Sequence, residues 1–280
     1  MLDLLAHNTA LFTGACALLG LVVGSFLNVV AHRLPIMLQR QWQADGGAAI
    51  AAERFDLAFP ASHCPHCKAP IAWRHNLPLI GWLWLRGRCA ACKAPISARY
   101  PVLELAAGLL AGAAALRFGP GFAAVAAVGL SLTLLVLTRI DIDHLLLPDA
   151  ITLPGIWAGL LVNLGGTFTD LRSAVIGAVA GYLSLWLVYH AFKRLTGKEG
   201  MGYGDFKLLA LLGAWLGWQA LPACILLASL VGTLYGVVSI ARGAHARQQP
   251  FPFGPFLAVA GWINLMWGEA LQAAYLQAAF

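Results

Sequence analysis

The sequence predicts an all-α polytopic membrane protein with about eight transmembrane helices and one small polar insert. Three observations support this prediction. Hydrophobic residues make up 60% of the 280 positions and charged residues 11%, whereas soluble proteins average about 45–50% and about 25%. Apolar runs close to the about 17–25 residues that cross a bilayer recur along the chain. Four of the six cysteines stand in pairs within one polar region. Too few polar side chains remain to cover a soluble globule.

Seven apolar runs follow one another along the chain. The first, 11–31, has no Lys or Arg before it and is followed by Arg33 and Arg40. A cleavable signal peptide has its positive charge first, so we expect an uncleaved anchor with its N-terminus outside. Polar breaks at 139–149 and 193–205 and a turn at 219–222 separate several later helices. We expect these at 102–116, 122–138, 150–164, 174–192, 206–240 (a hairpin of two) and 256–276.

The charges test this topology. The net charge is +6, which in a soluble protein would suggest nucleic acid. Here all 18 Lys and Arg residues except Arg117 and Arg172 fall in segments that the topology places inside, as the positive-inside rule requires. We therefore expect no nucleic-acid partner. The predicted parts are a first transmembrane helix (1–31), a cytoplasmic region (32–101) and a membrane domain (102–280).

The cytoplasmic insert carries a short repeat. Cys64-Pro-His-Cys67-Lys-Ala-Pro-Ile recurs as Cys89-Ala-Ala-Cys92-Lys-Ala-Pro-Ile. Two C-x2-C turns can supply four thiolates to one tetrahedral zinc ion, in a closed and therefore structural site. Disulfides and a redox C-x-x-C are the alternatives, but a reducing cytoplasm and the duplicated flanks disfavour them. The remaining cysteines, Cys16 and Cys224, are expected to be packing residues.

Two aspartates carry the chemical hypothesis. Asp141 and Asp205 each flank an apolar helix on the same predicted face. Ionisable groups at a membrane boundary cost free energy, so their presence there indicates a function. If their helices are neighbours, the two carboxyls can meet. Two carboxyls that share a site cannot both ionise easily, so one stays protonated near neutral pH. The pair can then activate a water as base and protonate a carbonyl as acid. Gly202 and Gly204 would let a substrate backbone approach closely.

Other readings of these acidic residues stay open. Asp149 and Asp205 could each cap the helix that follows, and Asp143 could be a solvated loop residue. Lys207 could orient the turn at Gly202–Asp205 or act as a positive-inside anchor. Membrane carboxylates also serve as proton relays, so the residues alone leave a secondary transporter as an alternative to a hydrolase.

The chain resembles the type 4 prepilin peptidase family along nearly its whole length. The resemblance rests on the order and co-occurrence of several motifs. These are Gly24-Ser-Phe-Leu-Asn-Val-Val30 with Arg33-Leu-Pro35, the paired C-x2-C turns, Arg99-Tyr-Pro-Val-Leu-Glu104, Ile140-Asp141 to Leu147-Pro-Asp149, Gly202-Tyr-Gly-Asp205 and Pro252-Phe-Gly-Pro255.

The resemblance implies a GxGD-type aspartyl protease of the bacterial inner membrane. Its substrates would be prepilins of type IV pili and pseudopilins of type II secretion, cut on the cytoplasmic side after the glycine that ends a basic leader. It would then methylate the new N-terminal residue with S-adenosylmethionine. The aspartate of the family's GxGD motif corresponds to Asp205. The second catalytic aspartate corresponds to Asp141, seven residues before Pro148.

The methyl-donor site is the least defined part of this prediction. No Gly-rich dinucleotide-type fingerprint follows a strand. Asn76, Arg99 and Glu104 lie in or beside the cytoplasmic region and are the candidates for binding the donor. Structural anchoring at the start of the second helix explains Arg99 and Glu104 equally well.

Overall fold

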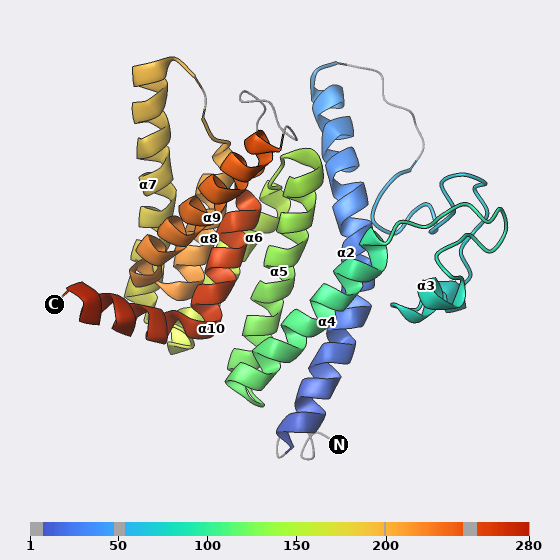
Figure 1. Cartoon of the computed structure of the whole chain (residues 1–280), viewed down its shortest axis with the longest axis horizontal. Helices are drawn as coiled ribbons and strands as arrows, with labels where there is room; N and C mark the ends of the chain where they lie inside the picture. Colours follow the sequence, from blue (N-terminus) through green and yellow to red (C-terminus); the bar gives the residue numbers. More distant parts are fainter. Residues whose placement is uncertain (1–7, 48–53, 199, 243–250, 280) are drawn as a thin grey trace. The chain divides into compact units, whose positions relative to one another are not determined.

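A computed structural model describes residues 8–47, 54–198, 200–242 and 251–279. The chain forms two compact units, Met1–Val136 and Leu137–Phe280. Within the described residues the regular structure is helical (Figure 1), and strand-like pairing is limited to two isolated bridges. The all-α prediction is confirmed.

The first unit is built on α2 (Thr9–Asp45) and α4 (Arg99–Phe118), which pack side by side (Figure 1). Asn8 caps α2 by accepting a hydrogen bond from the Leu11 amide at 3.0 Å. The helix continues well past the predicted end at residue 31, and Gly46 follows its last turn. Residues 37–44 are mostly unbranched side chains that favour helix, so the helix continues after the apolar run ends.

Small residues set the distance between α2 and α4. A side-chain carbon at Gly20 would lie 2.6 Å from the Ala107 carbonyl oxygen, and one at Gly108 would lie 2.8 Å from Leu21. These positions admit no larger side chain, so the two backbones approach closely, as small residues allow in membrane helices.

The insert between these helices contains short elements only. They are the 3-10 turn η1 (Trp73–Asn76) and α3 (Ile80–Trp84). Arg33 of α2 is buried and holds the insert's first loop, because its guanidinium donates to the carbonyls of Asp56 at 2.9 Å and Pro60 at 2.6 Å.

The second unit surrounds one central helix, α8 (Tyr203–Leu216). Its residues from 205 to 215 are almost all buried, and it packs against its neighbours α6, α7 and α10, with fewer contacts to α9. The bounds of the surrounding helices are α6 (Asp149–Val162), α7 (Leu171–Thr196), α9 (Leu221–Ala241) and α10 (Gly254–Ala279). Helix α5 (Phe122–His144) brings the chain into this unit, and α10 bends at Trp267.

Five helical stretches of the described residues are long and apolar enough to cross a membrane. They are α2, α4, α5, α7 and the stretch Trp218–Ser239, which includes most of α9. The prediction of a multi-pass membrane protein is supported, but eight spans are not confirmed. With 14 residues each, α6 and α8 extend about 21 Å, less than the ~30 Å hydrocarbon core.

The predicted polar breaks are shorter than expected. Helix α5 runs on to His144, so the break there is confined to residues 145–148, and Leu145 has a φ of +51°. Helix α7 ends at Thr196 with Gly197 in the left-handed region at φ +69°. Asp141 therefore lies on a helix rather than in a loop, which fixes the direction of its side chain.

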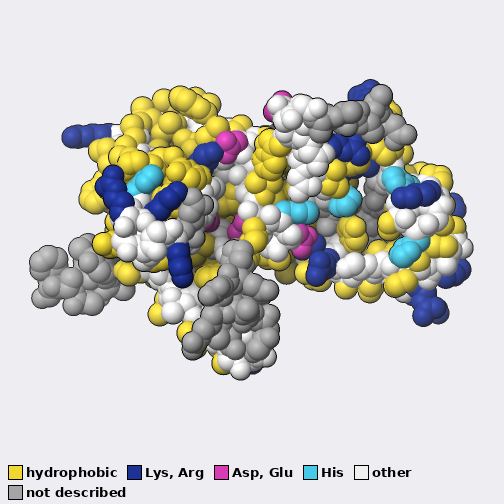
Figure 2. All heavy atoms as spheres, turned by 90° about the horizontal axis from the view of Figure 1, so that it is seen from above, with side chains coloured by type: hydrophobic (Ala, Val, Ile, Leu, Met, Phe, Trp, Pro, Cys, Tyr) yellow, Lys and Arg dark blue, Asp and Glu magenta, His cyan; other side chains and the backbone are white. Residues whose placement is uncertain are grey.

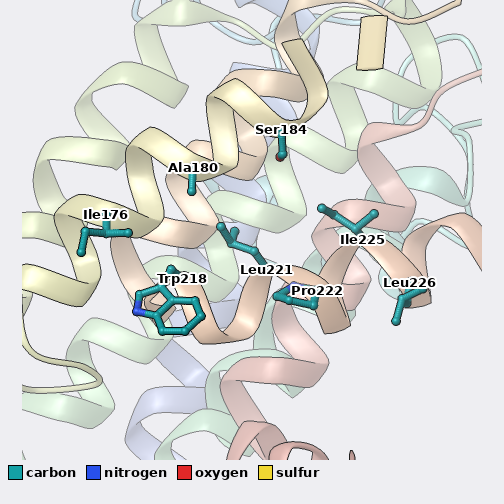
Figure 3. A pocket seen from close by; sticks show the side chains of 8 residues that line it. All are labelled: Ile176, Ala180, Ser184, Trp218, Leu221, Pro222, Ile225 and Leu226. Atoms are coloured by element: carbon teal, nitrogen blue, oxygen red, sulfur yellow. The ribbon is translucent and has the colours of Figure 1, made fainter. Parts of the chain in front are cut away.

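The second unit also contains an apolar groove of about 520 Å³. Figure 3 shows its lining from α7, from Trp218 before α9 and from the first turns of α9, namely Ile176, Ala180, Ser184, Trp218, Leu221, Pro222, Ile225 and Leu226. None of the predicted site residues lines it.

Candidate functional site

Asp141 is buried near the end of α5, with 5% of its surface exposed. Its Oδ2 accepts a hydrogen bond from the backbone amide of Gly254 at 3.0 Å. Gly254 is the first residue of α10, where amides have no partner within their own helix. Asp141 satisfies one of these amides, and the bond fixes the carboxylate against the start of α10.

Asp205 lies in the first turn of α8 and is 7% exposed. The helix begins after Gly202, whose backbone is extended, and no side chain caps it. Asp205 therefore does not cap α8, which was the alternative role for it. A carboxylate in a helix's first turn interacts favourably with the positive end of the helix dipole.

The structure brings these two carboxylates together within the second unit. The charge of Asp141 acts on Asp205, so the two groups interact electrostatically. Leu147 lies beside Gly204, which precedes Asp205 in the chain, and beside Gly254, whose amide binds Asp141. Its side chain would be 2.8 Å from a side-chain carbon at Gly204 and 3.2 Å from one at Gly254. The ends of α5, α8 and α10 thus meet around a buried leucine and a pair of aspartates.

The two glycines of the Gly202-Tyr-Gly204 turn have different surroundings. Beside Gly202, the nearest atom to an added side-chain carbon would be Asp205 Oδ2, at 3.9 Å. The space beside Gly204 is filled by Leu147 of the same chain. Close backbone approach of a substrate remains possible at Gly202, whereas Gly204 is required for packing.

The other nearby acidic residues form ion pairs. Asp149 does not cap α6. Both of its carboxylate oxygens accept from Lys207 Nζ, at 2.6 and 2.7 Å. Asp143 pairs with Arg139 one turn earlier on α5, at 2.8 Å, and is neither in a loop nor fully solvated. These pairs leave Asp141 and Asp205 as the buried carboxylates that have no cationic partner among the described residues of the second unit.

The four cysteines of the repeat form a separate site in the first unit. Their sulfur atoms all lie within 4.8 Å of one another, with Cys64–Cys92 at 3.8 Å and Cys67–Cys89 at 3.9 Å. These separations exclude disulfides, whose sulfurs are about 2.05 Å apart. A tetrahedron with Zn–S bonds of ~2.3 Å has edges of about 3.8 Å. The cluster could hold a metal ion and fits zinc.

The repeat in sequence is also a repeat in conformation. In each turn the first cysteine's amide donates to the carbonyl five residues later, at 2.9 Å for Cys64 and 2.8 Å for Cys89. Lys68 and Lys93 both have a φ of +60°. Backbone amides of Cys92 and Ala91 directed at the Cys89 sulfur lower the pKa of that thiol to about 6. They favour the thiolate that binds metal.

The three candidates for the methyl-donor site differ in their surroundings. Asn76 ends η1 and Arg99 begins α4, and both side chains are exposed. Glu104, one turn further along α4, is buried and accepts a hydrogen bond from the Leu79 amide at 2.8 Å.

Two residues of the aspartate site, Leu147 and Gly254, had no role predicted from the sequence. The Phe253-Gly254-Pro255 turn was the available signal for the second.

Comparison with known proteins identifies the family. Residues 18–118 match the bacterial peptidase A24 N-terminal domain, and residues 128–237 match the type IV leader peptidase family. Proteins named prepilin leader peptidase/N-methyltransferase are 55% identical in Aeromonas hydrophila and 50% identical in Pseudomonas aeruginosa. The first alignment covers 97% of both chains, and the second covers 99% of this chain and 98% of its relative. No solved structure matches the chain. This protein belongs to the type IV leader peptidase family.

Proposed function

We propose that this protein removes the leader from type IV prepilins and pseudopilins and then methylates the new N-terminal residue. The name of its relatives, prepilin leader peptidase/N-methyltransferase, supports both activities, at 50–55% identity over almost the whole chain. The observation that carries the peptidase assignment is the buried pair of Asp141 and Asp205, with no cation beside them in the second unit's described residues.

The pair suits a mechanism without a covalent intermediate. One aspartate, as the carboxylate, takes a proton from a water molecule, which attacks the scissile carbonyl, while the other, as the protonated carboxyl, gives its proton to the carbonyl oxygen. The tetrahedral intermediate then returns that proton and collapses, the C–N bond breaks, and the first aspartate passes the water's proton to the leaving amine. The Gly254 amide occupies Oδ2 of Asp141 and leaves Oδ1 for the water.

The charged end of the second unit supports cleavage on the cytoplasmic side. The end of α7 and the start of α8 carry Lys193, Arg194, Lys198 and Lys207, and Figure 2 shows Lys and Arg side chains on the face seen from above. Under the positive-inside rule this end faces the cytoplasm, where the methyl donor is available. We place the enzyme in the bacterial inner membrane with its N-terminus outside.

The finer architecture follows from this topology. Eight transmembrane segments result if α6, α8 and α10 are counted with the five long spans. The functional parts are then an anchor (1–31), a cytoplasmic zinc region (32–101) and a membrane peptidase domain (102–280). A short α8 is compatible with this arrangement, because its buried surface faces other helices rather than lipid.

Zinc and S-adenosylmethionine are the proposed ligands of the cytoplasmic side. Zinc, held by Cys64, Cys67, Cys89 and Cys92, would join the two halves of the insert and stabilise its fold. S-adenosylmethionine supplies the methyl group when bound, and Asn76, Arg99 and Glu104 remain the candidate binding residues. The first two present polar groups to solvent, and the third presents a buried carboxylate.

Intact mass spectrometry of a prepilin incubated with the purified enzyme tests this proposal. We expect loss of the leader without the donor, and a further gain of one methyl group when S-adenosylmethionine is present. Asp205→Asn should abolish the first change. If the folded, zinc-loaded wild type cleaves none of several prepilins, the substrate assignment is wrong and a carboxylate proton relay becomes the better explanation of the aspartates.

A further inference from the structure

Glu104 is a buried carboxylate at the junction of three elements of the first unit. Only 8% of its surface is exposed. Its backbone lies against α2, since a side-chain carbon at Gly24 would be 3.0 Å from Glu104 Cα. Its side chain reaches the start of α3, where Oε2 accepts the Leu79 amide at 2.8 Å.

The Glu104 carboxylate has no cationic partner in the part of the chain that the structure describes. Among the residues that the structure describes, Glu104 takes part in no ion pair, and the Leu79 amide is its one hydrogen-bond donor. A buried carboxylate is costly unless it is paired or fully hydrogen-bonded. Arg33, the buried cation of the same unit, is committed to two carbonyls of the insert's first loop. Within the described residues, this leaves the Glu104 carboxylate available to a cation from outside the chain.

Asn28 adds a second acceptor to the same interface. Its Nδ2 donates to the carbonyls of Tyr100, at 3.2 Å, and Gly24, at 3.4 Å. Tyr100 lies one turn before Glu104 on α4, and Gly24 lies opposite Glu104 on α2. With its amide nitrogen occupied, Asn28 has its Oδ1 left as an acceptor. An ammonium group, with three donors and a positive charge, matches a carboxylate and an amide oxygen.

We propose that Glu104, assisted by Asn28, binds a primary ammonium group. This inference rests on the proposed function, because methyl transfer brings two such groups to the enzyme. One is the new N-terminus of the cleaved pilin, and the other is the amino-acid end of S-adenosylmethionine. Both present the same chemistry to a buried carboxylate, so the experiment must separate them.

A purely structural role makes a different prediction for one conservative substitution. Leu79 has a φ of +58°, and Glu104 would merely hold its amide in place. Glu104→Gln keeps an acceptor for that amide and removes only the charge, whereas Glu104→Ala removes both. An anchor tolerates Gln and fails with Ala. An ammonium site fails with both, while zinc content and thermal unfolding of the Gln variant stay at the wild-type values.

The test compares wild type, Glu104→Gln and Glu104→Ala in leader cleavage and in methylation of a leaderless pilin. For the Gln variant we expect wild-type cleavage and methylation reduced at least about tenfold, as expected when one partner of a buried charge pair is neutralised. Cleavage thus reports on the proposed peptidase separately from Glu104. Methylation at the wild-type rate by the Gln variant would overturn the inference.

Binding measurements separate the two ammonium sources and remain informative without turnover. The probes are S-adenosylhomocysteine and a peptide of the first mature pilin residues, free or acetylated at its N-terminus. If the pilin amine is the ligand, wild type prefers the free peptide and Glu104→Gln loses that preference. If the donor is the ligand, Glu104→Gln weakens S-adenosylhomocysteine instead. Unchanged binding of both probes by the Gln variant rejects an ammonium site.

Discussion

Asp141 and Gly254, 113 positions apart in the chain, are joined by a buried 3.0 Å hydrogen bond from the glycine amide to the carboxylate. The bond connects the end of α5 to the start of α10. It gives the first amide of α10 a partner and gives the aspartate a fixed orientation. A carboxylate held in this way is preorganised, because no side-chain entropy has to be lost when substrate arrives.

Gly254→Ala should remove most peptidase activity. The new methyl group would lie 2.7 Å from Asp141 Oδ2, so the carboxylate must move, and a displacement of about 1 Å at a reacting group can cost ~10²-fold in rate. Initial rates of prepilin cleavage measure the effect. Gly236→Ala in α9 is the matched control, since nothing lies within 4 Å of its added carbon. Equal loss in both variants would mean that general destabilisation, not Asp141, is responsible.

Asp141→Asn should insert and fold but not cleave. The amide oxygen of Asn can still accept the Gly254 amide, so the helix contact is kept while the proton-transfer group is lost. We expect a rate reduction of at least about 10²-fold, typical of removing a general acid or base. Asp143→Asn, two residues away and paired with Arg139, should cleave normally. The opposite pattern in a mass-spectrometric assay would move the catalytic role to Asp143.

Lys207→Met should reduce cleavage modestly. The ion pair with Asp149 ties the start of α8, which carries Asp205, to the start of α6. Both side chains are partly exposed, so the pair contributes at most ~1 kcal/mol, or about fivefold in rate. Asp149→Asn should have the same effect, and the double variant should show no further loss. Additive losses would reject a shared positioning role, and Lys198→Met controls for the loss of one basic residue from this end.

Cys64→Ser should lower the zinc content and destabilise the insert. Metal analysis of the purified wild type should find about one zinc per chain, as expected for a four-thiolate site. The same loss is expected at the other three positions, because a structural site needs all its ligands. Cys16→Ser, in α2 and outside the cluster, should keep the metal. A wild type without zinc, whose four thiols all react with an alkylating reagent, would contradict the assignment.

The cysteine site and the acidic residues differ in how far the sequence could predict them. The cysteine site was predictable because both turns are local and the spacing within each turn fixes two sulfurs. The structure confirms that all four can meet. The choice of Asp141 over Asp143 and Asp149 depended on the family resemblance. The pairing of Asp149 could not be predicted, because its partner, Lys207, is 58 positions away.

Composition and apolar periodicity by themselves determined that the chain is helical, enters a membrane several times and carries a paired cysteine insert, because these properties depend on local residue content. Only the tertiary structure decided that α8 is enclosed by its neighbours, that Leu147 fills the space beside Gly204, and that Asp141 faces Gly254. These contacts join residues distant in sequence. They follow from how closely helices pack, which depends on the shapes of both surfaces at once.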